Sequence, residues 1–274
     1  MRTKCQPAST VLLALVAAPL WLAQSWTLPH GATVKNNRPR CYRFTVEYFT
    51  ANLYGEINTR QRLIGDYTLG LPTGDVVWNN VSEAKAEGAT SPYGPPEKVE
   101  FMEGFHYRRN AKESADVLAP DFFKNFPPTA VFERNLVWDT QMIEDFGQLH
   151  FDDLKLNQPY HTLSSEAIKM PEVGQFQNRD VELQWLGKSQ RNGQNCALIE
   201  YSAFFNPLEI ANAGINMKGR SHYWGQIWVA TATRQIEFAT LNEDVLGELT
   251  LPGQSAPMTI SVFRRGTLAP VARD

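Results

Sequence analysis

The sequence predicts a mainly β protein, in which an antiparallel curved sheet closes into a barrel or half-barrel, with one central helix at about residues 135–149 and short helical turns. Short runs of β-branched and aromatic residues, bounded by Gly, Pro, Asn and Asp, recur along most of the chain. Apolar residues at helical spacing are concentrated in one central stretch. The links between the strand-like runs are short, which favours antiparallel neighbours.

The first 25 residues have the composition of a cleavable secretory signal peptide. Arg2 and Lys4 precede an apolar run over residues 11–23, and small residues follow it. The run is shorter than the roughly 20 residues that a membrane-spanning helix needs. We therefore expect cleavage before Trp26, a secreted or periplasmic location and no stable membrane span after cleavage, with a retained signal anchor as the alternative.

Residues 26–40 are polar and contain two prolines, so we expect a flexible lead-in, followed by a single β-rich domain over residues 41–268. The first strand is predicted at Cys41–Phe49, where aromatic and aliphatic residues alternate with polar ones. Further strands are predicted over residues 61–71, 76–81 and 99–108, with a proline-rich surface loop at 91–97.

In the middle of the chain the spacing of apolar residues changes from the alternation of a strand to the spacing of a helix. Val137, Met142, Phe146 and Leu149 recur at roughly helical spacing and predict the central helix, with a short helical turn expected at residues 121–126. A second short helix is predicted from Asn206-Pro207-Leu208-Glu209 to Gly214, because Asn is a favoured cap and Pro a favoured first residue.

The last hundred residues predict two hairpins and a closing strand. Residues 181–185 and 197–205 flank Asn192-Gly193, a pair that favours a tight turn. The second hairpin is predicted from residues 223–231 and 234–241, and the closing strand over 258–263.

Cleavage of the signal would remove Cys5 and leave Cys41 and Cys196, which an oxidising compartment would allow to form a disulfide; two buried free thiols are the alternative. Without residues 1–25 the chain carries 24 basic and 29 acidic residues, a net charge of about −5. The chain is acidic overall and contains no block of basic residues. These features argue against binding to nucleic acid, and against binding to a membrane surface through a polybasic segment.

The sequence provides weak candidates for catalysis. Histidines outside the lead-in are His106, His150, His161 and His222, and none belongs to an HExxH or CxxC pattern, so we predict no metal and no cofactor. Nucleotide-binding and serine-nucleophile motifs such as GxGxxG and GxSxG do not occur. Adjacent acidic pairs would point to opposite faces of a strand, so a catalytic dyad would need distant segments.

Aromatic residues provide the main indication of a binding site. Trp224 and Trp228 fall on one face of a strand, Tyr223 falls on the other, and Phe205 precedes them. A strand that is apolar on both faces fits either a packed core or the wall of a ligand-binding barrel. We take these four residues as candidate ligand contacts, with plain core packing as the alternative.

Three functions follow from these observations. The leading hypothesis is a secreted or periplasmic protein that binds an apolar or amphipathic small molecule in the barrel or half-barrel. The alternatives are a secreted hydrolase or lyase that acts on an extracellular polymer through the candidate histidines, and a non-catalytic envelope interaction module. The sequence leaves enzymatic activity open and leans against it. In architecture alone, the outline resembles periplasmic lipid-carrier half-barrels and calycin-like barrels.

Overall fold

The computed structural model describes residues 39–109, 117, 119, 121–162, 167–170, 173–211, 216–251, 253 and 256–271. The expected signal peptide and nearly all of the lead-in lie outside the described residues. In the described part, thirteen strands form one sheet whose main path runs β4-β3-β2-β1-β13-β12-β11-β10-β8-β7, with β5 beside β3, β9 beside β10, and β6 beside β9. The strands are β1 (Arg40–Ala51), β2 (Ile57–Leu69), β3 (Asp75–Glu87), β4 (Glu97–Lys98), β5 (His106–Arg108), β6 (Pro159–Thr162), β7 (Ala167–Met170), β8 (Gly174–Gln177), β9 (Val181–Arg191), β10 (Gln194–Ala211), β11 (Asn216–Ala230), β12 (Ile236–Thr250) and β13 (Met258–Pro270).

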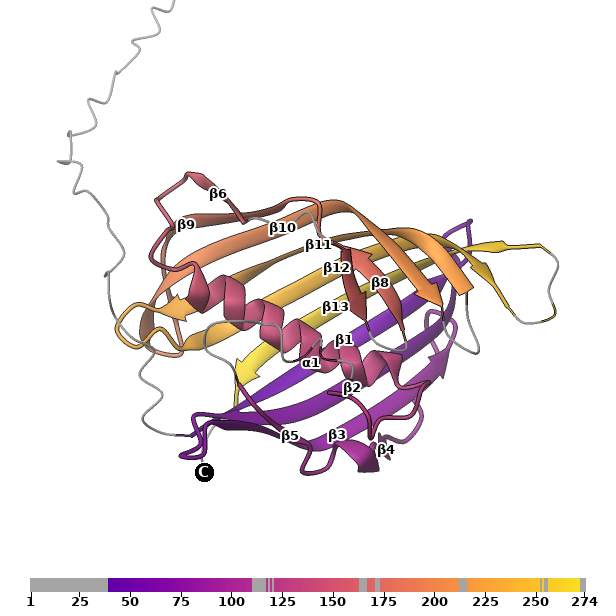
Figure 1. The fold of residues 1–274 in the computed structure, drawn as a ribbon, viewed down its shortest axis with the longest axis horizontal. Coiled ribbons are helices and arrows are strands. Elements are labelled where there is room, and N and C mark those ends of the chain that lie inside the picture. The colour runs from indigo at the N-terminus through magenta and orange to yellow at the C-terminus, as the bar shows by residue number, and fades with distance from the viewer. Residues whose placement is uncertain are drawn as a thin grey trace, which may run out of the picture.

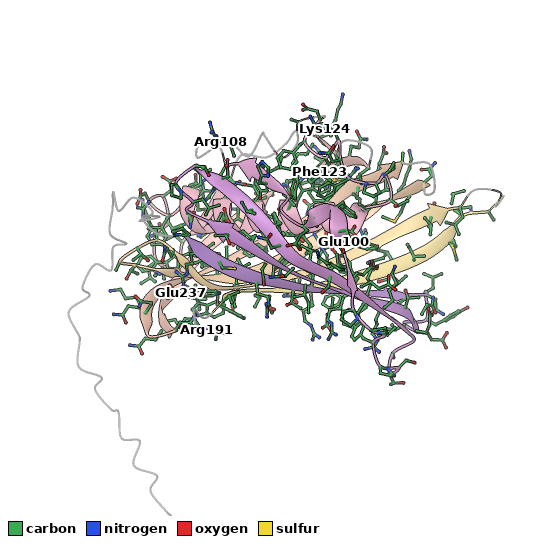
Figure 2. The ribbon with its side chains drawn as sticks, turned by 90° about the horizontal axis from the view of Figure 1, so that it is seen from below. Glu100, Arg108, Phe123, Lys124, Arg191 and Glu237 are labelled. Atoms are coloured by element: carbon green, nitrogen blue, oxygen red, sulfur yellow. The ribbon has the colours of Figure 1, made fainter. Side chains whose placement is uncertain are left out.

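The sheet is antiparallel and curved, and hydrogen bonds between the described strands do not close it, so the architecture is a half-barrel. Helix α1 (Val131–Glu144) lies across its concave face (Figure 1). The predicted fold class is therefore confirmed. In Figure 2 the segment with Phe123 and Lys124 lies on one side of the molecule, and Arg191 and Glu237 lie on the other.

Alternation of side chains along the strands builds the core. In β1, Tyr42, Phe44, Val46 and Tyr48 are buried on the concave face, as the sequence pattern predicts. The chain returns through β13 beside β1, with Phe44 opposite Leu268. This pairing joins the N-terminal and C-terminal strand groups into one continuous sheet.

The central helix is present and begins four residues before the predicted start, at Val131. It continues as a π-helical turn, η3 (Asp145–Leu149), so together they cover the predicted range. Within this turn, a Cβ on Gly147 would lie 3.1 Å from Ile227 of β11. The absence of a side chain at Gly147 therefore lets the end of the helix approach the sheet closely.

The hairpin predicted at Asn192-Gly193 joins β9 to β10, and both turn residues have positive φ angles, 49° and 72°. The second predicted hairpin is formed by β11 and β12. The short helical turn expected at residues 121–126 appears as successive hydrogen-bonded turns, including Lys124 to Asp121 and Phe126 to Phe123.

Two local predictions were wrong. The helix predicted from Asn206 is part of β10, because Asn206 uses its side chain to hydrogen-bond Ala203 and Arg179 across a bulge instead of capping a helix. Pro207 is tolerated because the pairing with β8 starts only at Leu208.

The continuous strand predicted over residues 99–108 is interrupted. Glu100–Met102 forms a short 3-10 helix, η1, that buries Met102, and Gly104 turns the chain at a φ of 71° before β5 begins.

Candidate functional site

A cavity of about 530 Å³ lies between α1 and the concave face of the sheet. Its walls come from the helix, from the central strands β1 and β10 to β13, and from β7 and β8. Most of the lining is apolar. The apolar side chains include Phe132, Trp138, Met142, Ile168, Met170, Phe176, Leu208, Ile210, Met217, Val245, Leu249, Ile260 and Val262.

The helix presents one side to this cavity. Phe132, Asn135, Asp139 and Met142 line it, and their spacing of three or four residues places them on one helical face. Other helix residues, such as Leu136, are fully buried. One face of α1 therefore packs in the core, and another face forms part of the cavity wall.

An aromatic cluster packs beside the helix, against β3 and β5. Ring contacts of 4.7–6.3 Å, mostly edge-to-face, connect its members. They are Phe101, Phe105, Tyr107, Phe122, Phe123, Phe126 and Trp138. The cluster holds α1 beside the sheet, and Trp138 belongs to both the cluster and the cavity wall.

A buried ionic cluster forms the most polar part of the wall. Arg264 of β13 donates a hydrogen bond of 2.6 Å from Nη1 to Asp139 of α1. Its Nε donates to Glu243 of β12, and the Ser221 hydroxyl donates to the same carboxylate. Asp139, Glu243 and Arg264 line the cavity, so this cluster is where a bound molecule would meet charge.

The pKa of Asp139 is raised to about 7. Burial is the main cause; Arg264 opposes the shift, and the negative charge of Glu243 adds to it. The carboxyl group of Asp139 is therefore partly protonated near neutral pH. Asp145, at the end of α1, also lines the cavity; burial raises its pKa, although a hydrogen bond of 2.8 Å from Gln141 favours the charged form.

Two tyrosines add hydroxyl groups to the wall. Tyr223 donates a hydrogen bond of 2.8 Å to Asn178. The hydroxyl of Tyr48 is buried, and its polar neighbours are Asn135 and Arg264. Tyr48 packs its ring edge-to-face against Phe132 at 4.6 Å.

A second buried group of charged residues lies at the C-terminal end of α1. Glu144 pairs with Arg109 at 3.1 Å and accepts a hydrogen bond of 3.0 Å from Tyr67. Arg109 also donates to Gln148 of η3. These residues are absent from the cavity lining, and they tie the helix end to β2.

Among the four aromatic residues predicted to contact a ligand, Tyr223 lines the cavity. The cavity lining does not include Trp224, Trp228 or Phe205, whose side chains lie on the opposite, convex face of the sheet. Trp224 and Phe205 are exposed there, and Trp228 packs on Phe238 at 5.4 Å. Contact of these three residues with a ligand therefore stays a prediction, and the cavity between α1 and the sheet does not involve them.

The four candidate histidines are dispersed. His106 is exposed in β5, and His161 pairs at 2.9 Å with Asp180, which is also exposed. His222 lies on the convex face against Phe205, and His150 packs on Tyr160 outside the cavity. Burial lowers the pKa of His150 and a hydrogen bond to Asp180 raises the pKa of His161.

The described residues contain no group of three or more His, Cys, Asp or Glu side chains that could hold a metal ion. In the same part of the chain, no helix combines the length and the apolar character needed to cross a membrane.

Cys41 and Cys196 are not joined by a disulfide in this structure. They belong to β1 and β10, which are separated in the sheet by β13, β12 and β11. The disulfide between them stays a prediction.

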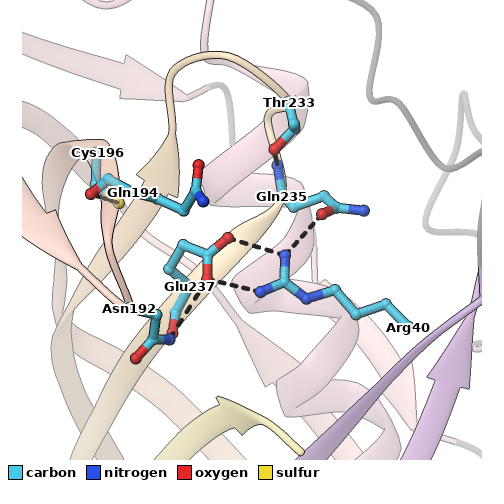
Figure 3. Close-up of polar contacts among 7 residues, drawn as sticks. All are labelled: Arg40, Asn192, Gln194, Cys196, Thr233, Gln235 and Glu237. Carbon is cyan, nitrogen blue, oxygen red and sulfur yellow. Dashed lines mark hydrogen bonds and ion pairs between the residues drawn. The ribbon is translucent and has the colours of Figure 1, made fainter. Parts of the chain in front are cut away.

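A second, polar hollow of about 540 Å³ lies at the start of β1, and its lining includes Arg40, Asn192, Gln194, Gln235 and Glu237. Figure 3 shows Arg40 bonded to both carboxylate oxygens of Glu237, at 2.9 and 2.6 Å, and to Gln235 at 2.7 Å. Asn192 donates to the Glu237 carbonyl at 3.0 Å. These bonds tie the start of β1 to the β9–β10 and β11–β12 hairpins.

No protein-family model matches the chain, and no curated protein sequence matches it. A solved structure that describes lipid–protein interactions in lipovitellin is similar over 85% of this chain, with 12% identity and a TM-score of 0.39. The chain spans 25% of the length of that lipovitellin chain.

A DUF1329 family protein from Desulfovibrio piger is 7% identical over 87% of this chain and 89% of its own, with a TM-score of 0.18. A structure of botulinum neurotoxin type C, whose title reports interaction with two ganglioside molecules, is 7% identical over 85% of this chain and 83% of its own, with a TM-score of 0.13. At these TM-scores, the likenesses have no bearing on the function of this protein.

Proposed function

We propose that this protein binds an apolar or amphipathic small molecule in the cavity between α1 and the concave face of the sheet. The observation that carries the proposal is the apolar lining of this cavity, because the polar hollow at the start of β1 has a similar volume, about 540 Å³, without such a lining. A space of about 530 Å³ falls within the range of small-molecule sites, which are mostly apolar with a few convergent polar groups.

The lining matches this kind of ligand. Flexible methionines such as Met142, Met170 and Met217 adapt to apolar molecules of different shape. The ionic cluster around Arg264 supplies one polar region, which fits the polar end of an amphiphile.

The two other functions considered have less support. A hydrolase that used the candidate histidines would need one of them beside a buried acid in a cleft, but the only described histidine–carboxylate ion pair, His161 with Asp180, is exposed. An interaction module would not need a cavity with an apolar lining, so this cavity favours binding of a small molecule.

We also propose that residues 1–25 direct export and are removed, which would place the protein in the periplasm or outside the cell. The support is the composition of that segment. The intact mass of protein isolated from its own host tests this proposal: we expect a start at Trp26, and a full-length mass would contradict it. The same mass reports whether Cys41 and Cys196 are joined.

Native mass spectrometry of that material, compared with the denatured protein, tests ligand binding. We expect an additional mass that is lost on denaturation, or saturable binding of the apolar dye N-phenyl-1-naphthylamine if the ligand was lost during purification. No bound mass together with no saturable dye binding would contradict the proposal.

A further inference from the structure

The ionic groups in the cavity wall are predominantly negative. Three carboxylates line the cavity, Asp139, Asp145 and Glu243, and Arg264 is the one cationic side chain in the described lining. The formal charge of the lining is therefore −2 when every carboxylate is ionised and −1 when Asp139 is protonated, so it is negative in both states of Asp139.

The arginine is already engaged by two of these carboxylates. Nη1 of Arg264 is bonded to Asp139 at 2.6 Å, and Nε is bonded to Glu243. Its side chain is only 11% exposed. An anionic group that entered the cavity would have to compete with both carboxylates for the guanidinium, in surroundings where repulsion between like charges is stronger than in water.

The remaining polar groups favour a ligand that donates hydrogen bonds. Carboxylates are acceptors, and an ionised carboxylate has about four lone-pair sites. A ligand hydroxyl or amine placed beside these carboxylates could donate a hydrogen bond to one of them.

From these contacts we infer that the cavity selects a ligand whose polar group donates hydrogen bonds and carries no negative charge, such as an alcohol or an amine. The inference rests on the proposed function, because it names the chemistry of the ligand in the same cavity. The apolar lining would hold the hydrocarbon part, and the cluster of Asp139, Glu243 and Arg264 would hold the polar end.

Displacement of bound N-phenyl-1-naphthylamine by three amphiphiles of equal chain length, dodecanol, dodecylamine and dodecanoate, tests the inference at neutral pH below their micelle concentrations. We expect dodecanoate to bind about tenfold or more weakly than the other two, a difference of roughly 1.4 kcal/mol or more. Displacement by dodecanoate as effective as that by dodecanol would overturn the inference while leaving the proposed function intact. Failure of the dye to bind, together with no bound mass in the native protein, would overturn both.

A matched pair of variants locates the effect. Glu243→Gln removes a negative charge from the cavity wall, whereas Asp244→Asn removes one from the next residue of β12, which points to the opposite face. We expect Glu243→Gln to reduce the ratio of the dodecanoate Kd to the dodecanol Kd at least threefold. We expect Asp244→Asn to leave this ratio unchanged. An equal effect of both variants would contradict a role for the cavity charge. Asp139→Asn replaces Glu243→Gln if thermal unfolding shows that the latter does not fold.

Discussion

Arg264 and Asp139 are 125 residues apart in sequence and form a hydrogen-bonded ion pair of 2.6 Å that joins β13 to α1. Both side chains are buried, with exposures of 11% and 5%. Removing one partner of a buried ion pair costs about 3–5 kcal/mol, because the remaining charge is left without compensation. We therefore expect Arg264→Leu to lower the free energy of unfolding in urea by about that amount.

The neighbouring residue provides the control. Arg265 points to the other face, is 58% exposed and pairs with Glu47 at 2.6 Å. Exposed pairs contribute about 0–1 kcal/mol, so Arg265→Leu should have a small effect. Similar losses in both variants would show that the buried pair does not hold the helix to the sheet.

Stability should increase as the pH falls from about 8 to about 5. Burial raises the pKa of Asp139 to about 7 from an ordinary value of 3.8. Between these values the folded state holds a proton that the unfolded state has released, so the free energy of unfolding falls as pH rises. Burial also raises the pKa of Glu133, Glu144 and Asp145, with the same sign.

The measurement is Tm against pH for the wild type and for Asp139→Asn. The groups that face Asp139 are Arg264, Glu243, Tyr48 and Tyr201. The asparagine variant removes the titration of Asp139 while leaving these groups in place. We expect a shallower slope in the variant. A slope identical to that of the wild type would mean that Asp139 does not titrate in this range.

Gly225 of β11 leaves room for the Tyr201 hydroxyl group to lie against the strand and reach β12. Tyr201 of β10 donates a hydrogen bond of 2.8 Å to the carbonyl of Thr240 in β12. A Cβ on Gly225 would lie 2.0 Å from that carbonyl oxygen and 2.6 Å from the Tyr201 hydroxyl. We expect Gly225→Ala to destabilise the protein by about 2 kcal/mol or more, as measured by urea unfolding.

Gly94 serves as the matched control, because it is exposed and a Cβ there would meet its nearest neighbour, the Lys85 carbonyl oxygen, at an ordinary 3.5 Å. Gly94→Ala should change stability by less than about 0.5 kcal/mol. If both alanine variants were equally stable, the close approach at Gly225 would be refuted.

Most of the fold could be predicted because the strand period and the turn residues agree. The alternation in β1 and the turn at Asn192-Gly193 each determine a local structure without help from distant contacts. The segment at Asn206 could not be predicted this way, because its cap-like residues serve a bulge whose partners lie in other strands. Residues such as Asn are common both at the start of a helix and at a β-bulge, so the residue type alone does not distinguish the two.

The site was less predictable than the fold. Both faces of β11 are apolar, so the sequence could not determine whether Trp224 or Tyr223 faces the cavity; the helix and the neighbouring strands decide this. One signal for the ionic cluster was present: Glu243 falls on the same face of β12 as Leu241 and Val245. A carboxylate at such a position predicts a buried partner, but Arg264 and Asp139 could be identified as its neighbours only from the tertiary structure.

Filling the cavity tests its role as a binding site most directly. Val245 lines the cavity, whereas the next residue of β12, Leu246, is exposed on the opposite face. We expect Val245→Trp to weaken the binding of N-phenyl-1-naphthylamine about tenfold or more, and Leu246→Trp to leave it unchanged, with both variants folded by circular dichroism. Unaltered dye binding in folded Val245→Trp would contradict the conclusion that this cavity is where the protein holds its ligand.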